Sequence, residues 1–226
     1  MKTVAIVVAA GRGSRAASDQ GVKQYVEIGG ISVLVRAMCP FLAHAAISRV
    51  LVVIHADDRA LYDQVVAGLD SEKLMPPIVG GATRQQSVRA GLQAIASFQP
   101  DAVLIHDAAR PFVSDDDIDG VCAALEKQDG AVVGLPVVDT LKRSTGAPAR
   151  IGATVARTAL WRAQTPQGFR FAGILAAHEA AAADGRDDYT DDASIAEAAG
   201  VSPGTVYRLL RIHGGEPNRK PHRRSR

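Results

Sequence analysis

The sequence predicts an α/β protein with a Rossmann-like, mostly parallel twisted sheet that is covered by helices on both faces. Two observations predict this class. Short apolar runs alternate with amphipathic stretches along the chain, which is typical of strands that are joined by crossover helices. A glycine-rich cationic loop follows the first apolar run directly, as in folds that bind phosphates at strand ends. We expect a single domain over residues 1–220 and a basic, disordered tail over 221–226.

The expected elements follow from the spacing of the apolar residues. Apolar runs predict buried strands, and apolar positions at helical spacing predict helices. Thr83 and Gln86 fit a capping box, and acidic residues after Ser114 favour the start of a helix. The predicted strands cover 4–8, 50–55, 102–106 and 131–135, and the predicted helices cover 58–69, 83–98, 114–127, 171–183 and 191–199.

Residues 137–168 break this alternation. They are polar and β-branched, with a turn-rich centre at 144–148, and therefore predict a hairpin that projects from the domain. A projecting hairpin with few core anchors is either a subunit-exchange arm or a surface excursion. The residues themselves leave both interpretations open.

Composition and charge restrict the partners. The net charge is +2, and no run approaches the roughly 18 apolar residues of a membrane span. Residues 215–226 carry five Lys or Arg against one acid, but no aromatic residues interleave with them, which disfavours nucleic-acid binding. Cys39 and Cys122 lie in apolar, helical-looking surroundings, as in a protein of the reducing cytoplasm. We therefore expect a cytoplasmic location, without a nucleic-acid or membrane partner.

The loop after the first predicted strand has the composition of a phosphate site. Gly11 and Gly13 allow the backbone to approach a ligand closely, with N–H groups that can point at phosphate oxygens. Arg12, Arg15 and Lys23 add positive charge, and Arg15 can grip a phosphate in a forked geometry. An ordinary glycine turn is the alternative, but such a turn rarely collects three cations.

This loop matches neither common nucleotide motif. The chain has no P-loop run, and the dinucleotide fingerprint needs a glycine at position 16, which is Ala. The pattern A-A-G-x-G-x-R, with a Lys eight residues after the Arg, instead resembles the signature loop of sugar-phosphate nucleotidyltransferases.

Three further polar clusters are expected to lie at strand ends, where open parallel sheets bind ligands. One surrounds Gly81, Arg84 and Ser87, and its alternative is a glycine turn with a helix cap. The next joins Asp107 to Arg110, and its alternative is a structural ion pair at the sheet edge, because such charges are costly to bury unpaired. The last lies within residues 137–168, and its alternative is a solvated polar face; it contains Asp139, Thr140, Lys142, Arg143, Arg157 and 165–167.

The order of these clusters resembles one family. The motifs A-A-G-x-G-x-R, G-G-x-x-R-x-x-S-V, H-D-A-A-R-P, D-T-x-K, T-P-Q and T-D-D-A-S occur in succession. Together they resemble the 2-C-methyl-D-erythritol 4-phosphate cytidylyltransferases of the non-mevalonate isoprenoid pathway, from residue 3 to about residue 220.

The resemblance implies that residues 137–168 form a dimerisation arm, and therefore that the protein is a homodimer. It also implies a reaction and the residues that perform it. CTP and methylerythritol 4-phosphate would give CDP-methylerythritol and pyrophosphate with Mg²⁺, by positioning and electrostatic stabilisation. Arg15 and Lys23 would stabilise the transition state, and Asp107 would also lie near the metal. The implied CTP-binding residues are Ala10, Gly11, Gly13, Gly81, Arg84 and Ser87, and the implied substrate-binding residues are Asp107, Arg110, Thr140, Arg157, Thr165 and Lys220.

The chain also departs from the family pattern. Ala82 stands where an Asp is common, and the pattern stops abruptly after Lys220. We hypothesise a one-base frame slip just after the Lys220 codon, which resequencing of the gene would test. The alternatives are a cytidylyltransferase for another polyol phosphate, such as ribitol 5-phosphate, a sugar-1-phosphate nucleotidyltransferase, and a CTP-binding protein that the altered tail has inactivated.

Overall fold

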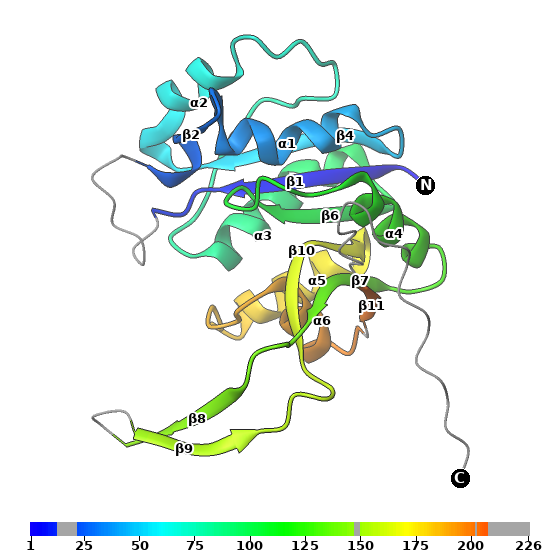
Figure 1. Ribbon diagram of the computed structural model, residues 1–226. Coiled ribbons are helices and arrows are strands. Elements are labelled where there is room, and N and C mark those ends of the chain that lie inside the picture. The colour runs from blue at the N-terminus through cyan, green and yellow to red at the C-terminus, as the bar shows by residue number, and fades with distance from the viewer. Residues whose placement is uncertain (13–21, 147–149, 202, 208–226) are drawn as a thin grey trace.

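A computed structural model describes residues 1–12, 22–146, 150–201 and 203–207, and its centre is a twisted seven-stranded sheet (Figure 1). The strand order is β11-β7-β10-β6-β1-β4-β5. Neighbouring strands are parallel except at β10, which runs antiparallel to both β6 and β7. The predicted mostly parallel sheet is confirmed. The strands are β1 (Thr3–Ala9), β4 (Ile47–Ile54), β5 (Ile78–Val79), β6 (Ala102–Asp107), β7 (Gly130–Pro136), β10 (Trp161–Arg170) and β11 (Pro203–Tyr207).

Helices cover both faces of the sheet, as predicted. Side chains alternate between the faces along each strand. In β1, Ile6 therefore packs with α3, α5 and α6, whereas Val7 packs with α1, α2 and α4 on the opposite face. The helices are α1 (Val33–Ala43), α2 (Arg59–Val66), α3 (Arg84–Ile95), α4 (Asp115–Leu125), α5 (Phe171–Ala183) and α6 (Asp192–Ala198).

The starts of α3 and α4 show how local sequence sets these helices. The Ser114 hydroxyl accepts from the N–H of Asp117, whose carboxylate accepts in return, so a complete capping box begins α4. At α3, Thr83 caps the N–H of Gln86 as expected. The Gln86 side chain instead accepts from the N–H of Ala82, so the predicted box at Thr83 is half formed.

The strand order places a crevice beside β1. From β1 the chain builds β4 and β5 on one side, then crosses back to form β6 on the other side. Loops that leave the carboxyl ends of β1 and β6 therefore diverge, and ligands bind at such a switch point in open α/β sheets.

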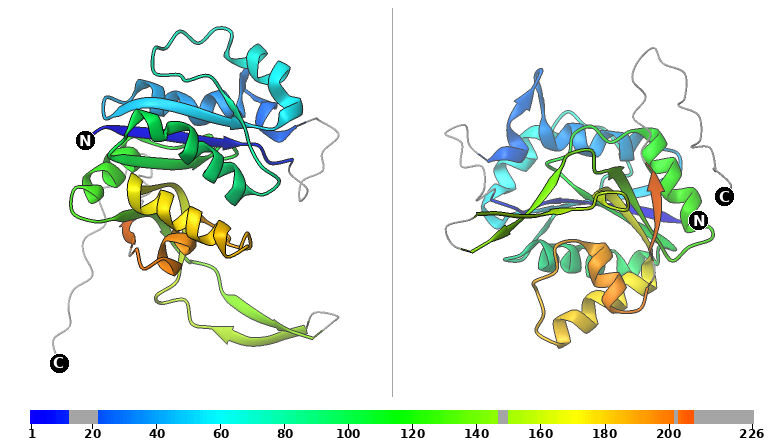
Figure 2. Two further views of the ribbon diagram at one scale, coloured as in Figure 1. Left: turned by 180° about the vertical axis from the view of Figure 1, so that it is seen from behind. Right: turned by 60° about the horizontal axis from the view of Figure 1, so that its bottom comes forward.

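A two-stranded hairpin projects from the body of the protein (Figures 1 and 2). It consists of β8 (Leu141–Thr145) and β9 (Arg150–Val155), and we call residues 137–160 the arm. The predicted arm of 137–168 extends too far, because β10 returns into the central sheet. Gln167 of β10 is buried, and the strand pairs with both β6 and β7, which fixes this segment in the core.

The two cysteines lie partly inside the protein. Cys39 and Cys122 are both free and half-buried. Burial raises the pKa of the Cys122 thiol to about 11, so the unreactive thiol form dominates at neutral pH. Across the described part of the chain, no helix combines the length and the apolar character that crossing a bilayer requires.

Candidate functional site

Residues that follow four neighbouring strands line a cavity of about 470 Å³ at the switch point. We call it the first cavity. This volume lies in the range of small-molecule binding sites. Its lining residues include Ala10 and Gly11 after β1, His55 after β4, Gly81, Arg84 and Ser87 after β5, and Asp107 at the end of β6.

The turn after β1 is fixed by a glutamine that the sequence analysis did not single out. Gln24 is buried in the short 3-10 helix η1 (Lys23–Tyr25). Its Nε2 donates to the carbonyl oxygens of Ala9 at 2.6 Å and Gly11 at 3.2 Å. Lys23 begins the same short helix, is exposed, and is not among the described residues that line the first cavity.

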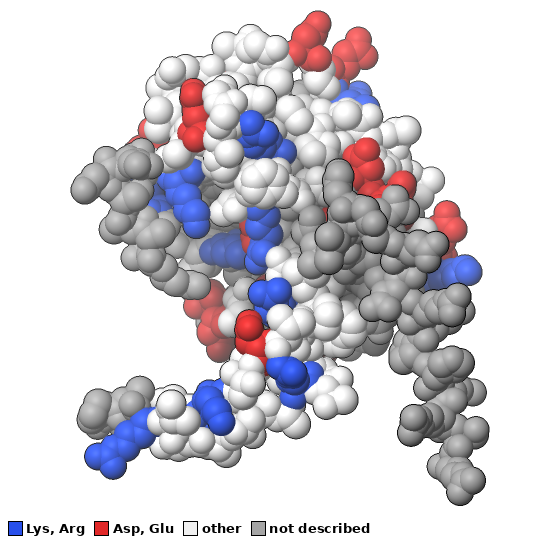
Figure 3. Space-filling view, viewed as in Figure 1, with Lys and Arg blue, Asp and Glu red and all other residues white. Residues whose placement is uncertain are grey.

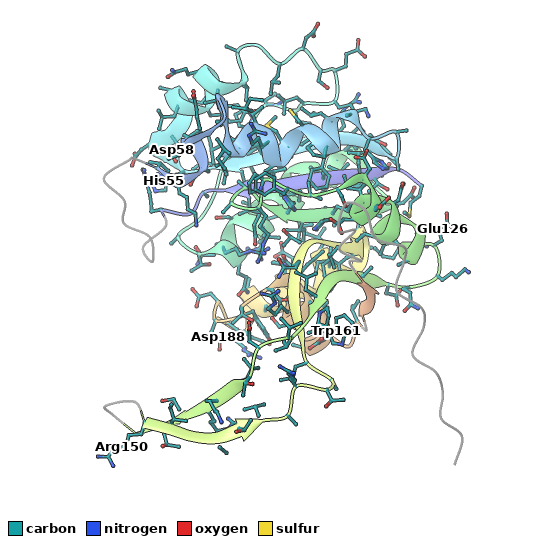
Figure 4. The ribbon with its side chains drawn as sticks, in the orientation of Figure 1. His55, Asp58, Glu126, Arg150, Trp161 and Asp188 are labelled. Atoms are coloured by element: carbon teal, nitrogen blue, oxygen red, sulfur yellow. The ribbon has the colours of Figure 1, made fainter. Side chains whose placement is uncertain are left out.

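Arg12 lines the first cavity but is already bound by acidic residues at the end of β4. Its guanidinium donates to Asp57 at 2.6 Å, to Asp58 at 3.0 Å and to the Nδ1 of His55 at 2.7 Å. Figure 4 labels His55 and Asp58, which lie close together at this edge. The expected positive charge of Arg12 is therefore offset within the protein itself.

The turn between β5 and α3 excludes side chains from the cavity wall. A Cβ on Gly81 would lie 2.5 Å from the Cβ of Gln86, so only glycine fits without rearrangement. Ser87 is buried, and its hydroxyl accepts from the N–H of Gly81 at 3.1 Å and donates to the carbonyl of Thr83 at 2.9 Å. The predicted CTP-binding residue Ser87 therefore also holds the shape of this turn.

A chain of ion pairs joins the first cavity to the protein interior. Arg84 contacts Asp107 at 2.9 Å and Asp192 of α6 at 2.8 Å. Asp107 also pairs with Arg110 at 3.3 Å, and the buried Asp192 contacts His178 of α5 at 3.2 Å. The ion pair that we considered between Asp107 and Arg110 is present, and both residues still line cavities.

These contacts shift the ionisation of the buried members. Burial alone would raise the pKa of Asp192, but the charge of Arg84 and the hydrogen bond from His178 outweigh it and hold that pKa below its ordinary value. Burial alone would lower the pKa of Arg84, but Asp192 and Asp107 outweigh it and raise that pKa. Both groups therefore stay charged, and the Arg84 guanidinium is held at the cavity wall.

A second cavity of about 380 Å³ shares a wall with the first. Arg84 and Asp107 line both cavities. Gln167 is buried, and its amide donates to Asp191 at 2.9 Å, which joins β10 to the start of α6. The other residues that line the second cavity are Arg110, Ala163, Gln164, Thr165 and Thr190.

Thr165 and Arg110 are held by contacts between β10 and the end of β6. The Thr165 hydroxyl accepts from the N–H of Asp107 at 3.2 Å and contacts the Nδ1 of His106 at 2.9 Å. The Gln164 side-chain oxygen accepts from the Arg110 guanidinium. Burial is the main cause that lowers the pKa of His106 to about 4, so this ring is neutral at neutral pH.

The structure does not bring every predicted site residue together. Thr140 and Arg157 lie on the arm, where both are exposed and are not among the described residues that line the two cavities. Arg157 donates to the carbonyl oxygen of Val138 within the arm. Gly13, Arg15 and Lys220 lie outside the described residues, as does the predicted tail at 221–226.

Few side chains at the two cavities could bind the magnesium ion that the resemblance implies. No group of three or more His, Cys, Asp or Glu side chains among the described residues could hold a metal ion. Asp107 is the carboxylate that lines the cavities at their shared wall, and each of its oxygens already accepts from a guanidinium. These residues fit a magnesium ion only where phosphate oxygens supply most of its ligands, as is usual for nucleotide-bound magnesium.

The mostly parallel sheet with paired cavities at its switch point is an α/β fold, and its likeness to solved cytidylyltransferase structures makes it nucleotidyltransferase-like. The profile of 2-C-methyl-D-erythritol 4-phosphate cytidylyltransferases matches residues 3–208. The chain belongs to this family.

Relatives and solved structures agree with this assignment. The chain is 52% identical over 204 residues to a bifunctional enzyme IspD/IspF of Bradyrhizobium diazoefficiens, which covers 90% of the chain and 50% of that relative. It is 47% identical over 219 residues to one from Paramagnetospirillum magneticum, which covers 97% of the chain and 53% of that relative. The chain therefore spans about half the length of the curated relatives it matches.

Among solved structures, the 2-C-methyl-D-erythritol 4-phosphate cytidylyltransferase of Thermus thermophilus is 32% identical with a TM-score of 0.71, and the match covers 93% of this chain and 90% of that one. The enzyme of Francisella tularensis is 26% identical with a TM-score of 0.76, and that match covers 92% and 90% of the two chains.

Proposed function

We propose that this chain transfers the cytidylyl group of CTP to 2-C-methyl-D-erythritol 4-phosphate, giving CDP-methylerythritol and pyrophosphate. The observation that carries the proposal is the pair of adjoining cavities with Arg84 and Asp107 in their common wall. Two polyanionic substrates must meet at one phosphorus atom, and a shared charged wall is suited to that task. Family membership supports the same reaction.

In this proposal the first cavity takes CTP and the second takes the polyol phosphate. A phosphate oxygen of the polyol phosphate forms a bond to the α-phosphorus of CTP. The bond from that phosphorus to the β-phosphate bridging oxygen breaks, and pyrophosphate leaves with the electron pair. A phosphate monoester is already a nucleophile near neutral pH, so the step needs no strong general base.

Each side chain then has a defined task. Arg84 and Arg110 hold phosphate oxygens. Arg84 keeps its position because its Nη2 pairs with the buried Asp192. Arg15 and Lys23 stabilise the charge that develops on the α-phosphate, as the family pattern implies. Mg²⁺ would arrive on the triphosphate, with Asp107 as the protein carboxylate nearest to it, and would neutralise phosphate charge.

We further propose that the arm forms a homodimer in which Thr140 and Arg157 complete the second cavity of the neighbouring subunit. Three observations support this. Thr140 and Arg157 are exposed in one chain, every residue of β8 is exposed, and Lys and Arg side chains lie along the arm (Figure 3). A negatively charged phosphate substrate binds to positively charged side chains, and these Lys and Arg residues carry that charge.

The family match favours neither of two alternative functions. Ribitol 5-phosphate would present the same phosphate to Arg110 but a different polyol to the walls of the second cavity. A CTP-binding protein without turnover is the other alternative. A cytoplasmic location stays a prediction that the two free cysteines support.

The deciding experiment measures pyrophosphate release from CTP and Mg²⁺ with methylerythritol 4-phosphate and, in parallel, with ribitol 5-phosphate. Release with the first substrate alone is expected. Release with ribitol 5-phosphate alone would move the chain to the other polyol class, and CTP binding without release would favour the inactive binding protein.

A matched pair of variants tests the assignment of the cavities. Arg110→Ala removes a guanidinium from the second cavity and is expected to raise the KM for methylerythritol phosphate at least about 10-fold, with the KM for CTP unchanged. Arg89→Ala is the control, because Arg89 lies on α3 beside Glu179 and lines neither cavity. Equal effects of the two substitutions would contradict the assignment.

A further inference from the structure

His106 is a buried polar residue for which the proposed reaction has no use. It lies at the penultimate position of β6, its side chain is fully buried, and it packs against the ring of Phe41 with 5.1 Å between ring centroids. Both ring nitrogens are occupied. Nε2 lies 2.9 Å from the carbonyl oxygen of Arg110, and Nδ1 lies 2.9 Å from the hydroxyl of Thr165.

The partners of His106 determine where its proton lies. A carbonyl oxygen only accepts, so Nε2 must carry the hydrogen and donate it to Arg110. The Thr165 oxygen already accepts from the N–H of Asp107 at 3.2 Å. Its hydroxyl hydrogen is therefore available for Nδ1, and the neutral Nε2–H tautomer satisfies every group in this cluster.

These contacts join three segments that line the second cavity. His106 ties the backbone of Arg110 to β6, while Thr165 ties β10 to the N–H of Asp107. Arg110, Thr165 and Asp107 all line the second cavity, and Arg110 and Thr165 are not among the described residues that line the first. Loss of the histidine would thus release the walls of one cavity and leave the other in place.

We propose that His106 is a positioning residue for the second cavity: it holds Arg110 and Thr165 at the separation that the second substrate requires, through hydrogen bonds from opposite sides of one ring. The identity of that substrate rests on the proposed function. The placement of the ring and of its two hydrogen bonds does not depend on the proposed function.

The kinetic test compares His106→Phe with His106→Gln. The phenylalanine keeps a ring against Phe41 but loses both hydrogen bonds, so kcat/KM for methylerythritol phosphate is expected to fall about 100-fold, the scale of a misplacement of about 1 Å. The KM for CTP is expected to stay within about 2-fold, since the first cavity keeps its contacts. The glutamine amide can still donate to Arg110, and is expected to recover part of the lost affinity for the second substrate.

His44→Gln is the matched control. His44 is a poorly exposed histidine that caps the end of α1 and contacts Asp119 at 3.2 Å, and it lines neither cavity. A purely structural role of His106 would lower kcat in proportion to the folded fraction and leave both KM values alone. That result, or equal losses for Phe and Gln, would overturn the proposal.

A second measurement is independent of activity. Nitrogen-15 NMR of labelled wild-type protein distinguishes the two neutral tautomers, and through-bond sequential assignment identifies the His106 ring without any variant. The Nε2–H tautomer is expected. A ring that carries its hydrogen on Nδ1, or that exchanges between tautomers, would overturn the proposal even if the variants fail to fold. Wild-type protein that releases no pyrophosphate would refute the proposed function alone.

Discussion

The strand-end cavities and the projecting arm contain residues that one family pattern assigns to one site, yet the chain holds them in opposite ways. Arg84 is fixed by Asp107 and by the fully buried Asp192. Thr140 and Arg157 are exposed, and the nearest contact of Arg157 is a backbone oxygen of the arm itself. The difference teaches that a fold can fix one predicted site residue through buried charges and leave others exposed on a projecting hairpin.

The two regions also differ in how much a substitution changes the free energy of unfolding. A buried charge network stabilises its members only while every partner is present, because an unpaired buried charge is strongly destabilising. An exposed pair contributes little to stability and can be lost without unfolding. Substitutions of the buried charges should therefore lower the free energy of unfolding, whereas substitutions on the arm should leave it nearly unchanged.

The largest effect is expected for Asp192→Asn, which removes the charge that binds Arg84 and His178. Breaking one partner of such a buried pair costs about 3–5 kcal/mol of the free energy of unfolding. Urea unfolding measures it, with the exposed Asp188→Asn as control; Asp188 is labelled in Figure 4. Equal stability of the two variants would contradict the claim that the buried charges behind the cavity wall stabilise the fold more than an exposed ion pair does.

The same variant makes a prediction about pH. The folded pKa of Asp192 lies below its ordinary value of 3.8, so the folded state binds this proton more weakly than the unfolded state. The stability from this group is then fully present above that ordinary value, and it is lost as the pH falls through the lower folded value. Urea unfolding from pH 6 downwards should show the difference between wild type and Asp192→Asn narrowing only below pH 3.8. A difference that does not depend on pH would contradict this.

An intermediate effect is expected on activity for Arg157→Ala, without a change in stability. Loss of a charge partner of the substrate costs at least about 2 kcal/mol, or roughly 30-fold in kcat/KM. Mixing Arg157→Ala with Arg110→Ala should restore about a quarter of the wild-type rate, because half of randomly formed dimers are mixed and each has one intact site. No recovery on mixing would mean that Arg157 does not serve the neighbouring subunit.

The smallest effect is expected for Lys142→Ala on the arm. Its ammonium donates to the hydroxyl of Thr154 at 2.6 Å across the hairpin, and both residues are exposed. The free energy of unfolding should change by less than about 0.5 kcal/mol. A loss above about 1 kcal/mol in urea unfolding would show that the arm stabilises the body of the protein, and would weaken the distinction between the two regions.

Much of the fold was predictable because its signals are local. The apolar runs that form β1, β4, β6 and β7 and the helical spacing of α5 are visible in consecutive residues. The return strand β10 was not predicted, because Pro166 and several polar residues interrupt it and a proline argues against a central strand. Its pairing depends on β6 and β7, which lie far away in the sequence.

The candidate site divides in the same way. The strand-end residues Gly81, Arg84 and Asp107 were predicted, since parallel strands bring their carboxyl ends to one edge. The contact between Arg84 and Asp192 was not, although the T-D-D-A-S motif contains that acid. Only the packing of α6 beside the sheet brings the two together, and spacing in one sequence carries no sign of it.

The position of β10 has a consequence for the newly made chain. This strand lies between β6 and β7, both of which precede it in the sequence. Until residues 161–170 leave the ribosome, β6 and β7 each present an open edge with unpaired backbone groups, and open edges are where chains aggregate. Because β10 supplies Ala163, Gln164 and Thr165, the second cavity cannot be complete before this strand has been made.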